Sequence, residues 1–294
     1  IGTESVYGTT LPDFMVWNQV QELPLFWRPF HSFGFTIAAV LLVPMLFATV
    51  FGYFAFRGRV RGVYFAILTQ ALVFAAWLVF NLNETNLGGT NGLTDFKQVL
   101  GFRLGDPTTQ LFLYMLTVFF VGAAYVLCRG IIHSRVGRVL IAIRDDEQRV
   151  VFSGYSPPNY KLFVFVVSAG LAGLAGALYV PQVGIITPSQ FGVLPSIEMA
   201  IWVAVGGRGT LTGAILGAVS VNWLRSLLTT HFPNLWPFFL GGLFVGVVML
   251  FPQGFVGVFR KLASGWRSWV RGQPKVTTTM EESGEQPMPH SGSS

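Results

Sequence analysis

The chain has 294 residues, of which 52% are hydrophobic and 11% are charged, and its net charge is +6 at pH 7. Soluble globular domains carry about 25% charged residues. This composition, with a single cysteine, therefore excludes a soluble enzyme, a disordered chain and a disulfide-stapled secreted domain. More than half of the chain lies in runs without Asp, Glu, Lys or Arg: 33–56, 62–83, 107–128, 162–197, 209–224 and 226–259.

A helix that crosses a bilayer needs about 20 mostly apolar residues. The charge-free runs therefore predict an all-α, polytopic transmembrane helical bundle. The first four crossings are expected at 33–56, 62–82, 107–128 and 162–180. Pro44 predicts a kink in the first of them. Asp106-Pro107 predicts the N-cap and the first residue of the third.

Basic residues alternate between the predicted loops. Loop 57–61 holds three, loop 129–161 six and the tail beyond 252 five of the 19 Lys and Arg, whereas residues 1–32 and loops 83–110 and 181–196 together hold three. Because positive residues mark the cytoplasmic side, we expect the start and loop 83–110 outside, and loop 129–161 and the C-terminus in the cytoplasm. This alternation also argues against a nucleic-acid partner, which would need one continuous basic surface.

The region after Pro181 predicts short helices. Runs 197–207 and 211–224 would extend only about 16 and 21 Å as helices. Gly206-Gly207-Arg208-Gly209 separates them. A re-entrant pair of half-helices, followed by a crossing at 235–251, would bring the tail to the inside. Three crossings by short helices are the alternative, because any odd number of crossings brings the tail to the cytoplasmic side.

Small residues recur every fourth position in three of the predicted helices. This spacing lets helix backbones approach closely in lipid. The stripes are Ala169, Gly173 and Ala177; Gly209, Gly213 and Gly217; and Gly242 with Gly246.

Loop 134–149 is the most informative polar segment. A short amphipathic helix is predicted after Gly137, with Val139, Ile143 and Val150 near one face and charges opposite. It could lie on the membrane surface or dock on a cytoplasmic partner. The acidic cluster Asp145–Glu147 disfavours anionic lipid and therefore favours docking. The Asp145-Asp146 pair is expected to be a solvated ion cluster rather than an acid–base dyad.

Polar residues inside apolar helices mark pathways or helix contacts. The translocation-path candidates are Gln70, Glu198, Arg208 and Asn222. For Glu198 a structural role is an alternative, with Ser196 as N-cap and the glutamate in the first helical turn. No catalytic residues, metal ligands or cofactors are predicted, since the four histidines are far apart and no phosphate-binding loop is present.

Several stretches resemble the LivM-type permeases of branched-chain amino-acid ABC importers, and most closely their urea-transport (UrtC) branch. The resemblance covers about residues 7–262. It is carried by the stretches 13–18, 91–97, 138–147, 160–163, 172–186, 196–198 and 200–213.

The resemblance implies a permease subunit in the plasma (inner) membrane of a bacterium, not an enzyme. The implied partners are a second homologous permease, two cytoplasmic ATPases that hydrolyse ATP, an extracytoplasmic binding protein and the lipid bilayer. Residues 137–153 would couple to an ATPase, with the ATPase-coupling candidates Gly137, Arg138, Arg144, Asp145, Asp146 and Glu147. We expect a permease domain over 1–272, N-terminally shortened relative to the family, and a disordered tail over 273–294.

The predicted membrane helices contain few charged residues. The expected cargo is therefore urea, because a small neutral solute needs no fixed charges in its path. A branched-chain amino acid is the alternative, since a zwitterion would favour charged groups or helix ends along the route. A passive urea or amide channel is a further alternative, although a stand-alone pore has no need of a charged docking loop. A membrane enzyme is disfavoured, since no nucleophile–base or metal arrangement is present.

Overall fold

The computed structural model describes two compact units, residues 1–203 and 204–294, each of which is treated by itself. The described residues are 27–58, 60, 62–82, 89, 92–93, 98–99, 102–207, 209–231 and 236–250. Arg208 and the tail 273–294 therefore lie outside the described residues, as do Arg59 and Arg61 of the first basic loop.

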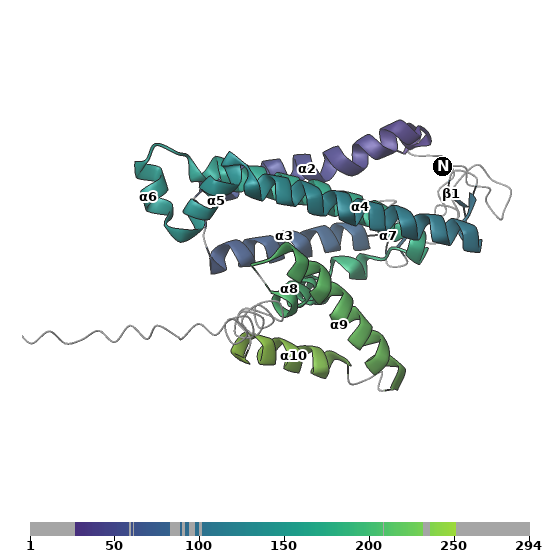
Figure 1. Ribbon diagram of the computed structural model, residues 1–294. Helices are drawn as coiled ribbons and strands as arrows, with labels where there is room; N and C mark the ends of the chain where they lie inside the picture. Colours follow the sequence, from purple (N-terminus) through teal and green to yellow (C-terminus); the bar gives the residue numbers. More distant parts are fainter. Residues whose placement is uncertain are drawn as a thin grey trace, which may run out of the picture. The chain divides into compact units, whose positions relative to one another are not determined.

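The first unit is built around long apolar helices (Figure 1). In chain order its elements are η1 (Arg28–His31), α2 (Phe33–Arg57), α3 (Val63–Asn81), β1 (Gln98–Val99), β2 (Phe102–Arg103), α4 (Pro107–His133), α5 (Arg135–Asp145), α6 (Glu147–Phe152), α7 (Pro157–Val183) and η4 (Pro188–Phe191). The second unit contains α9 (Leu211–His231) and α10 (Trp236–Leu250), and α8 (Val193–Gly206) runs across the boundary between the units.

Five described helices are long and apolar enough to cross a membrane: α2, α3, α4, α7 and the stretch Leu211–Thr230 of α9. The all-α polytopic prediction is therefore confirmed. The four predicted N-terminal crossings correspond to α2, α3, α4 and α7. Helix α7 starts earlier than expected and continues past Pro181 to Val183. The paired two-residue strands β1 and β2, which were not predicted, are a small exception to the helical fold.

Helices α2 and α7 make direct backbone contact through glycines. A Cβ atom at Gly173 would fall on the carbonyl oxygen of Val40 and close to the ring of Pro44. One turn earlier on α7, Gly170 meets the side chain of Met45, and from α2 Gly52 meets Leu162 and Phe165. The small residues predicted to form a close-packing stripe in α7 therefore include the contact point with α2.

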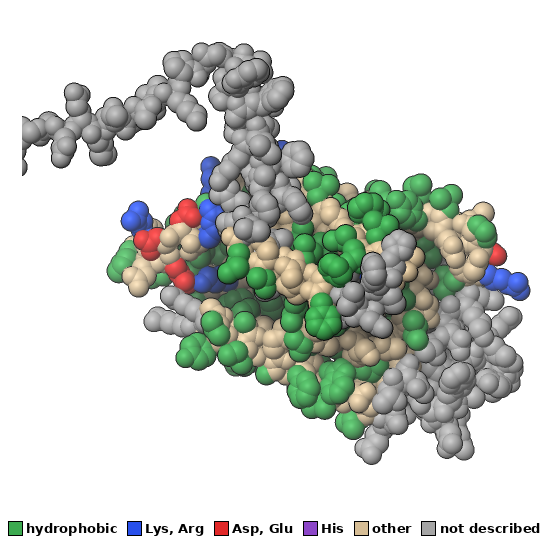
Figure 2. Space-filling model, turned by 90° about the horizontal axis from the view of Figure 1, so that it is seen from below, with side chains coloured by type: hydrophobic (Ala, Val, Ile, Leu, Met, Phe, Trp, Pro, Cys, Tyr) green, Lys and Arg blue, Asp and Glu red, His purple; other side chains and the backbone are tan. Residues whose placement is uncertain are grey.

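An aromatic cluster joins α2, α3 and α7 near this contact. Phe51, Phe56, Phe65 and Phe165 have ring centroids 5.4–6.3 Å apart. Many other large apolar side chains of the long helices are exposed, such as Leu46 and Phe54 of α2 and Phe119 of α4, at 67–71%. On the face drawn in Figure 2, hydrophobic side chains cover much of the surface, and most of the visible acidic side chains gather on the side of α5 and α6. Such a surface suits hydrocarbon rather than water.

The end of the first unit opposite α5 and α6 is closed by backbone pairing (Figure 1). Leu93 and Ile186 exchange both N–H···O bonds, at 2.8 and 2.9 Å, and so join the α3–α4 connection to the segment after α7. Gly92 has φ +69°, and a Cβ there would collide with the Ile186 carbonyl. Phe80 of α3 stacks on Phe191 of η4 at 4.8 Å.

The predicted break between two apolar helices is confirmed. Helix α8 ends at Gly206, Gly207 has φ +122°, and Thr210 caps α9 by accepting a hydrogen bond from the Gly213 amide at 3.2 Å. A Cβ at Gly206 would fall on the Gly213 carbonyl, with the Gly217 amide next to it, so Gly213 and Gly217 of the predicted stripe provide a backbone contact. By contrast, a Cβ at Gly209, Gly242 or Gly246 would meet nothing within 4 Å.

Helix α9 is longer than predicted. It has 21 residues and is long enough to cross, whereas α8 has 14 and is short as expected. The prediction ended this helix at Arg225, but a single cation does not terminate a helix. Helix α9 is therefore long enough to cross by itself, which the predicted half-helix was not.

The contact at Gly173 gives a first prediction. Gly173→Ala should lower the thermal unfolding temperature of the detergent-solubilised protein, because the added methyl must separate α2 from α7, at a cost of about 1–3 kcal/mol. Gly176→Ala is the matched control on the same helix, since its Cβ would meet nothing within 4 Å. It should leave stability unchanged or raise it slightly. Equal thermal unfolding temperatures for Gly173→Ala and Gly176→Ala would contradict the α2–α7 contact.

Candidate functional site

The site begins at a tight corner between α4 and α5. Ser134 caps α5 by accepting a hydrogen bond from the Gly137 amide at 3.3 Å, and its hydroxyl donates to the Ile131 carbonyl at 2.6 Å. Gly137 is buried, and a Cβ there would collide with the carbonyl oxygen of Ile132. Gly137 therefore holds the corner and is not exposed to a partner.

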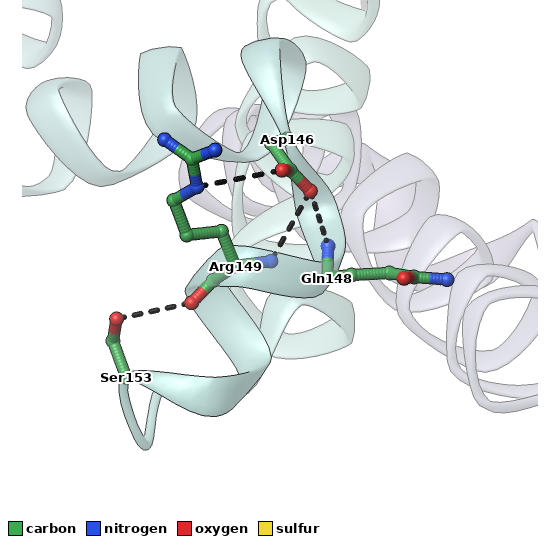
Figure 3. Close-up of polar contacts among 4 residues, drawn as sticks. All are labelled: Asp146, Gln148, Arg149 and Ser153. Atoms are coloured by element: carbon green, nitrogen blue, oxygen red, sulfur yellow. Dashed lines mark hydrogen bonds and ion pairs between the residues drawn. The ribbon is translucent and has the colours of Figure 1, made fainter. Parts of the chain in front are cut away.

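Asp146 forms the elbow between α5 and α6 (Figure 3). Its extended backbone ends α5, and its Oδ1 accepts hydrogen bonds from the amides of Gln148 and Arg149, both at 3.1 Å. The other carboxylate oxygen lies 3.5 Å from the Arg149 guanidinium. An aspartate N-cap satisfies amides that would otherwise lack partners. The predicted single helix is thus two helices, because Asp146 starts the second.

Two apolar side chains anchor this pair of helices to the rest of the unit. Ile143 of α5 and Val150 of α6 are 7% and 6% exposed. Both were predicted for the apolar face, although they lie on different helices. Val139, the third residue predicted for that face, is only half-buried.

The charged side chains of the segment divide into two groups. Arg144 and Asp145 pair with each other at 3.1 Å, but their side chains are 73% and 64% exposed. Glu147 instead points inward: its Oε1 lies 2.8 Å from Nζ of Lys161 on α7, and the two side chains are only 20% and 31% exposed. The exposed pair is worth little to stability because water screens it.

A groove of about 520 Å³ lies beside the Glu147–Lys161 pair. Phe56 and Val60, at and just beyond the end of α2, form one part of its lining, and residues of α6, the α6–α7 turn and the start of α7 form the rest: Glu147, Gln148, Val151, Phe152, Tyr155, Ser156, Pro157, Pro158 and Lys161. Phe152 is 89% exposed. A polar segment that carries an exposed aromatic side chain beside a groove has the character of a protein-contact surface.

The six coupling candidates thus lie on one continuous segment, in three different roles. Gly137 and Asp146 shape the segment, and Glu147 ties it to α7. Arg138, Arg144 and Asp145 are exposed and available to a partner.

Three of the four translocation-path candidates lie among the described residues, Gln70 and Glu198 in the first unit and Asn222 in the second. Gln70 on α3 has a buried Oε1 without a hydrogen-bond partner among the described residues. Glu198 is 8% exposed, while Asn222 is exposed and donates to the Ala218 carbonyl at 2.8 Å. The capping interpretation of Glu198 is wrong: α8 begins at Val193, so Ser196 lies inside the helix, where its hydroxyl donates to the Gly192 carbonyl.

Helix α9 carries a polar face that the prediction missed. Asn222, Arg225, Ser226, Thr229 and Thr230 line a hollow of about 420 Å³. Spacing of three, four and seven residues places such side chains on one side of a helix. This periodicity was readable in the sequence but was hidden when Arg225 was taken as the end of the helix.

Within the described part of the chain there is no group of three or more His, Cys, Asp or Glu residues that could hold a metal ion.

Comparison with known proteins assigns the family. Residues 10–251 match the family described as "Branched-chain amino acid transport system / permease component". The chain belongs to this family. The family prediction made from the LivM-like motifs is thereby confirmed, whereas the urea-specific branch is not established by this match.

Similar proteins are named for different transported solutes. The "High-affinity branched-chain amino acid transport system permease protein LivM" of Salmonella typhimurium is 28% identical over 232 residues, covering 70% of this chain and 54% of the relative. The "Probable branched-chain amino acid transport permease protein LivM" of Methanocaldococcus jannaschii is 24% identical, covering 85% and 73%. The "Ribose import permease protein RbsC" of Haemophilus influenzae is 25% identical, covering 70% and 62%.

The chain spans about half the length of the Salmonella relative. No solved structure matches it.

Asp146 gives the second prediction. Asp146→Ala should loosen α6 by removing its cap, at a cost of about 1 kcal/mol, and so speed tryptic cleavage after Arg149 about fivefold. Asp146→Asn is the matched control, because asparagine caps helices as well as aspartate does. Similar cleavage rates in the alanine variant and the unmodified protein would show that the cap does not hold α6.

Proposed function

We propose that this chain is a membrane-spanning permease subunit of an ATP-driven importer that moves a small polar solute into the cytoplasm. The family match supports the transport role, and the α5–α6 segment supports the ATP-driven mechanism. That segment is the observation on which the proposal rests most. A passive channel has no need of two capped, charged helices anchored at one end of its spanning helices.

In this proposal α5 and α6 dock on a cytoplasmic ATPase. Arg138, Arg144 and Asp145 are exposed and of mixed sign, which suits a polar rim around an apolar contact such as Phe152. The complete importer would hold a second homologous permease, two ATPases and an extracytoplasmic binding protein. The permease domain would extend over 1–272, with 273–294 as a tail.

The proposed orientation follows from charge. The α4–α7 connection, which carries α5 and α6, is rich in Arg, whereas the connection between α3 and α4 is poor in basic residues. By the positive-inside rule the former is cytoplasmic and the latter external, in the plasma (inner) membrane of a bacterium.

We propose urea as the cargo, on the strength of the motifs shared with urea-transport permeases. The relatives are named for branched-chain amino acids and for ribose, so this family serves chemically different solutes on one fold. A branched-chain amino acid is the second candidate. It is favoured by the names of the LivM relatives, which refer to branched-chain amino acids.

The orientation gives a third prediction. In a Cys128→Ser background, a membrane-impermeant maleimide should label Gly105→Cys in intact cells, but should label Ser153→Cys only after the cells are permeabilised. Both positions are exposed, and they lie at opposite ends of α4 and the segment that follows it. Labelling of Ser153→Cys in intact cells would place α6 outside and would overturn the ATPase-docking proposal.

The transport activity gives a fourth prediction. The permease, purified with its partner subunits and reconstituted in liposomes, should accumulate radiolabelled urea only when ATP is present on the side of the ATPases. ATP-dependent uptake of leucine without urea would replace the cargo by the second candidate. Urea flux through the permease alone, without nucleotide, would show a passive channel instead.

A further inference from the structure

A partly buried ion pair joins α6 to α7. Glu147 is the first residue of α6, and Lys161 lies in the second turn of α7, 14 residues later. Their 2.8 Å ion pair is the least exposed of those described for α5 and α6; the side chains of the other two pairs are 48–84% exposed. Partial burial makes such a pair stronger and more directional than a solvated one.

The surroundings of the pair set its strength. It lies at the groove formed with Phe56, Val60, Tyr155 and the two prolines that open α7. Apolar walls exclude part of the water that would screen the charges. Removing Glu147 would leave the Lys161 ammonium partly buried without this neighbour, which costs more than losing an exposed pair.

Lys161 also stands beside the contact between α7 and α2. The next residue, Leu162, and Phe165 one turn on both pack against Gly52 of α2. Because α2 and α7 are in backbone contact further along, at Gly173, a force applied at Lys161 acts on both helices together. The exposed Arg144–Asp145 pair joins neighbouring residues of α5 and has no such connection.

We propose that Glu147 and Lys161 form the latch that transmits a displacement of α6 to the α2–α7 pair. Glu147 is then a positioning residue that faces its own permease, while Arg138, Arg144 and Asp145 face the ATPase. This inference rests on the proposed function, since it assumes that an ATPase moves α6. Without the latch, α6 would be held only by the buried Val150 and the turn to α7, and less of its displacement would reach the spanning helices.

A charge-exchange cycle in the reconstituted importer tests the latch. Glu147→Lys and Lys161→Glu should each lower solute uptake per ATP hydrolysed about tenfold, whereas the double variant should recover most of it, because the pair is restored with its signs exchanged. Arg129→Gln, which removes one exposed charge at the end of α4 close to α5, is the control and should transport normally. Co-purification of the ATPase with each variant measures assembly separately from coupling.

The outcomes separate this inference from the proposed function. No ATP-dependent uptake by the unmodified importer would overturn the proposed function and the latch with it. Normal uptake per ATP in both single variants would overturn the latch alone. Loss of the ATPase from the single variants, without recovery in the double variant, would also overturn it, because the residues would then serve assembly. Recovery in the double variant supports a pairwise contact that transmits motion.

Discussion

The backbone contact between α2 and α7 is the interaction on which the first unit depends. In hydrocarbon no hydrophobic force brings helices together, so close packing has to supply the attraction. Gly173 allows the α7 backbone to reach the Val40 carbonyl, and the side chains around Gly52 and Gly170 fill the adjacent space. In the proposed mechanism this close contact lets a displacement at one end act on both helices.

Against this rigid pair, α5 and α6 form a separate lever. The corner at Gly137 and the elbow at Asp146 define the shape of the lever through backbone sterics and helix capping. Ile143 and Val150 anchor it, and the Glu147–Lys161 pair is its polar link to α7. Neighbouring charges therefore have different surroundings: Asp146 caps α6 and Glu147 pairs with Lys161, whereas Arg144 and Asp145 are exposed.

The sequence predicted the helices well, because a charge-free run of about 20 residues has few alternatives to a crossing. It failed where a single residue was given too much weight: Arg225 was taken as the end of α9, and Ser196 as the start of α8. The two roles of the Asp-Asp-Glu cluster were not predictable either. Capping by Asp146 depends on the local backbone angles, and the inward turn of Glu147 depends on Lys161, which is 14 residues away and on another helix.

The fold alone does not determine which solute is transported. The packing of α2 with α7 and the lever at α5–α6 would serve any solute, which agrees with relatives that are named for amino acids and for ribose. In our proposal discrimination comes from polar groups along the route, for which the α9 face around Asn222 and Arg225 is a candidate, or from a partner that delivers the solute. A neutral diamide such as urea can be held by amides and hydroxyls alone, whereas a zwitterion also gains from the guanidinium of Arg225. Arg225 is the charged residue among those that line the α9 hollow, and the second proposed cargo is the one to which that charge would matter.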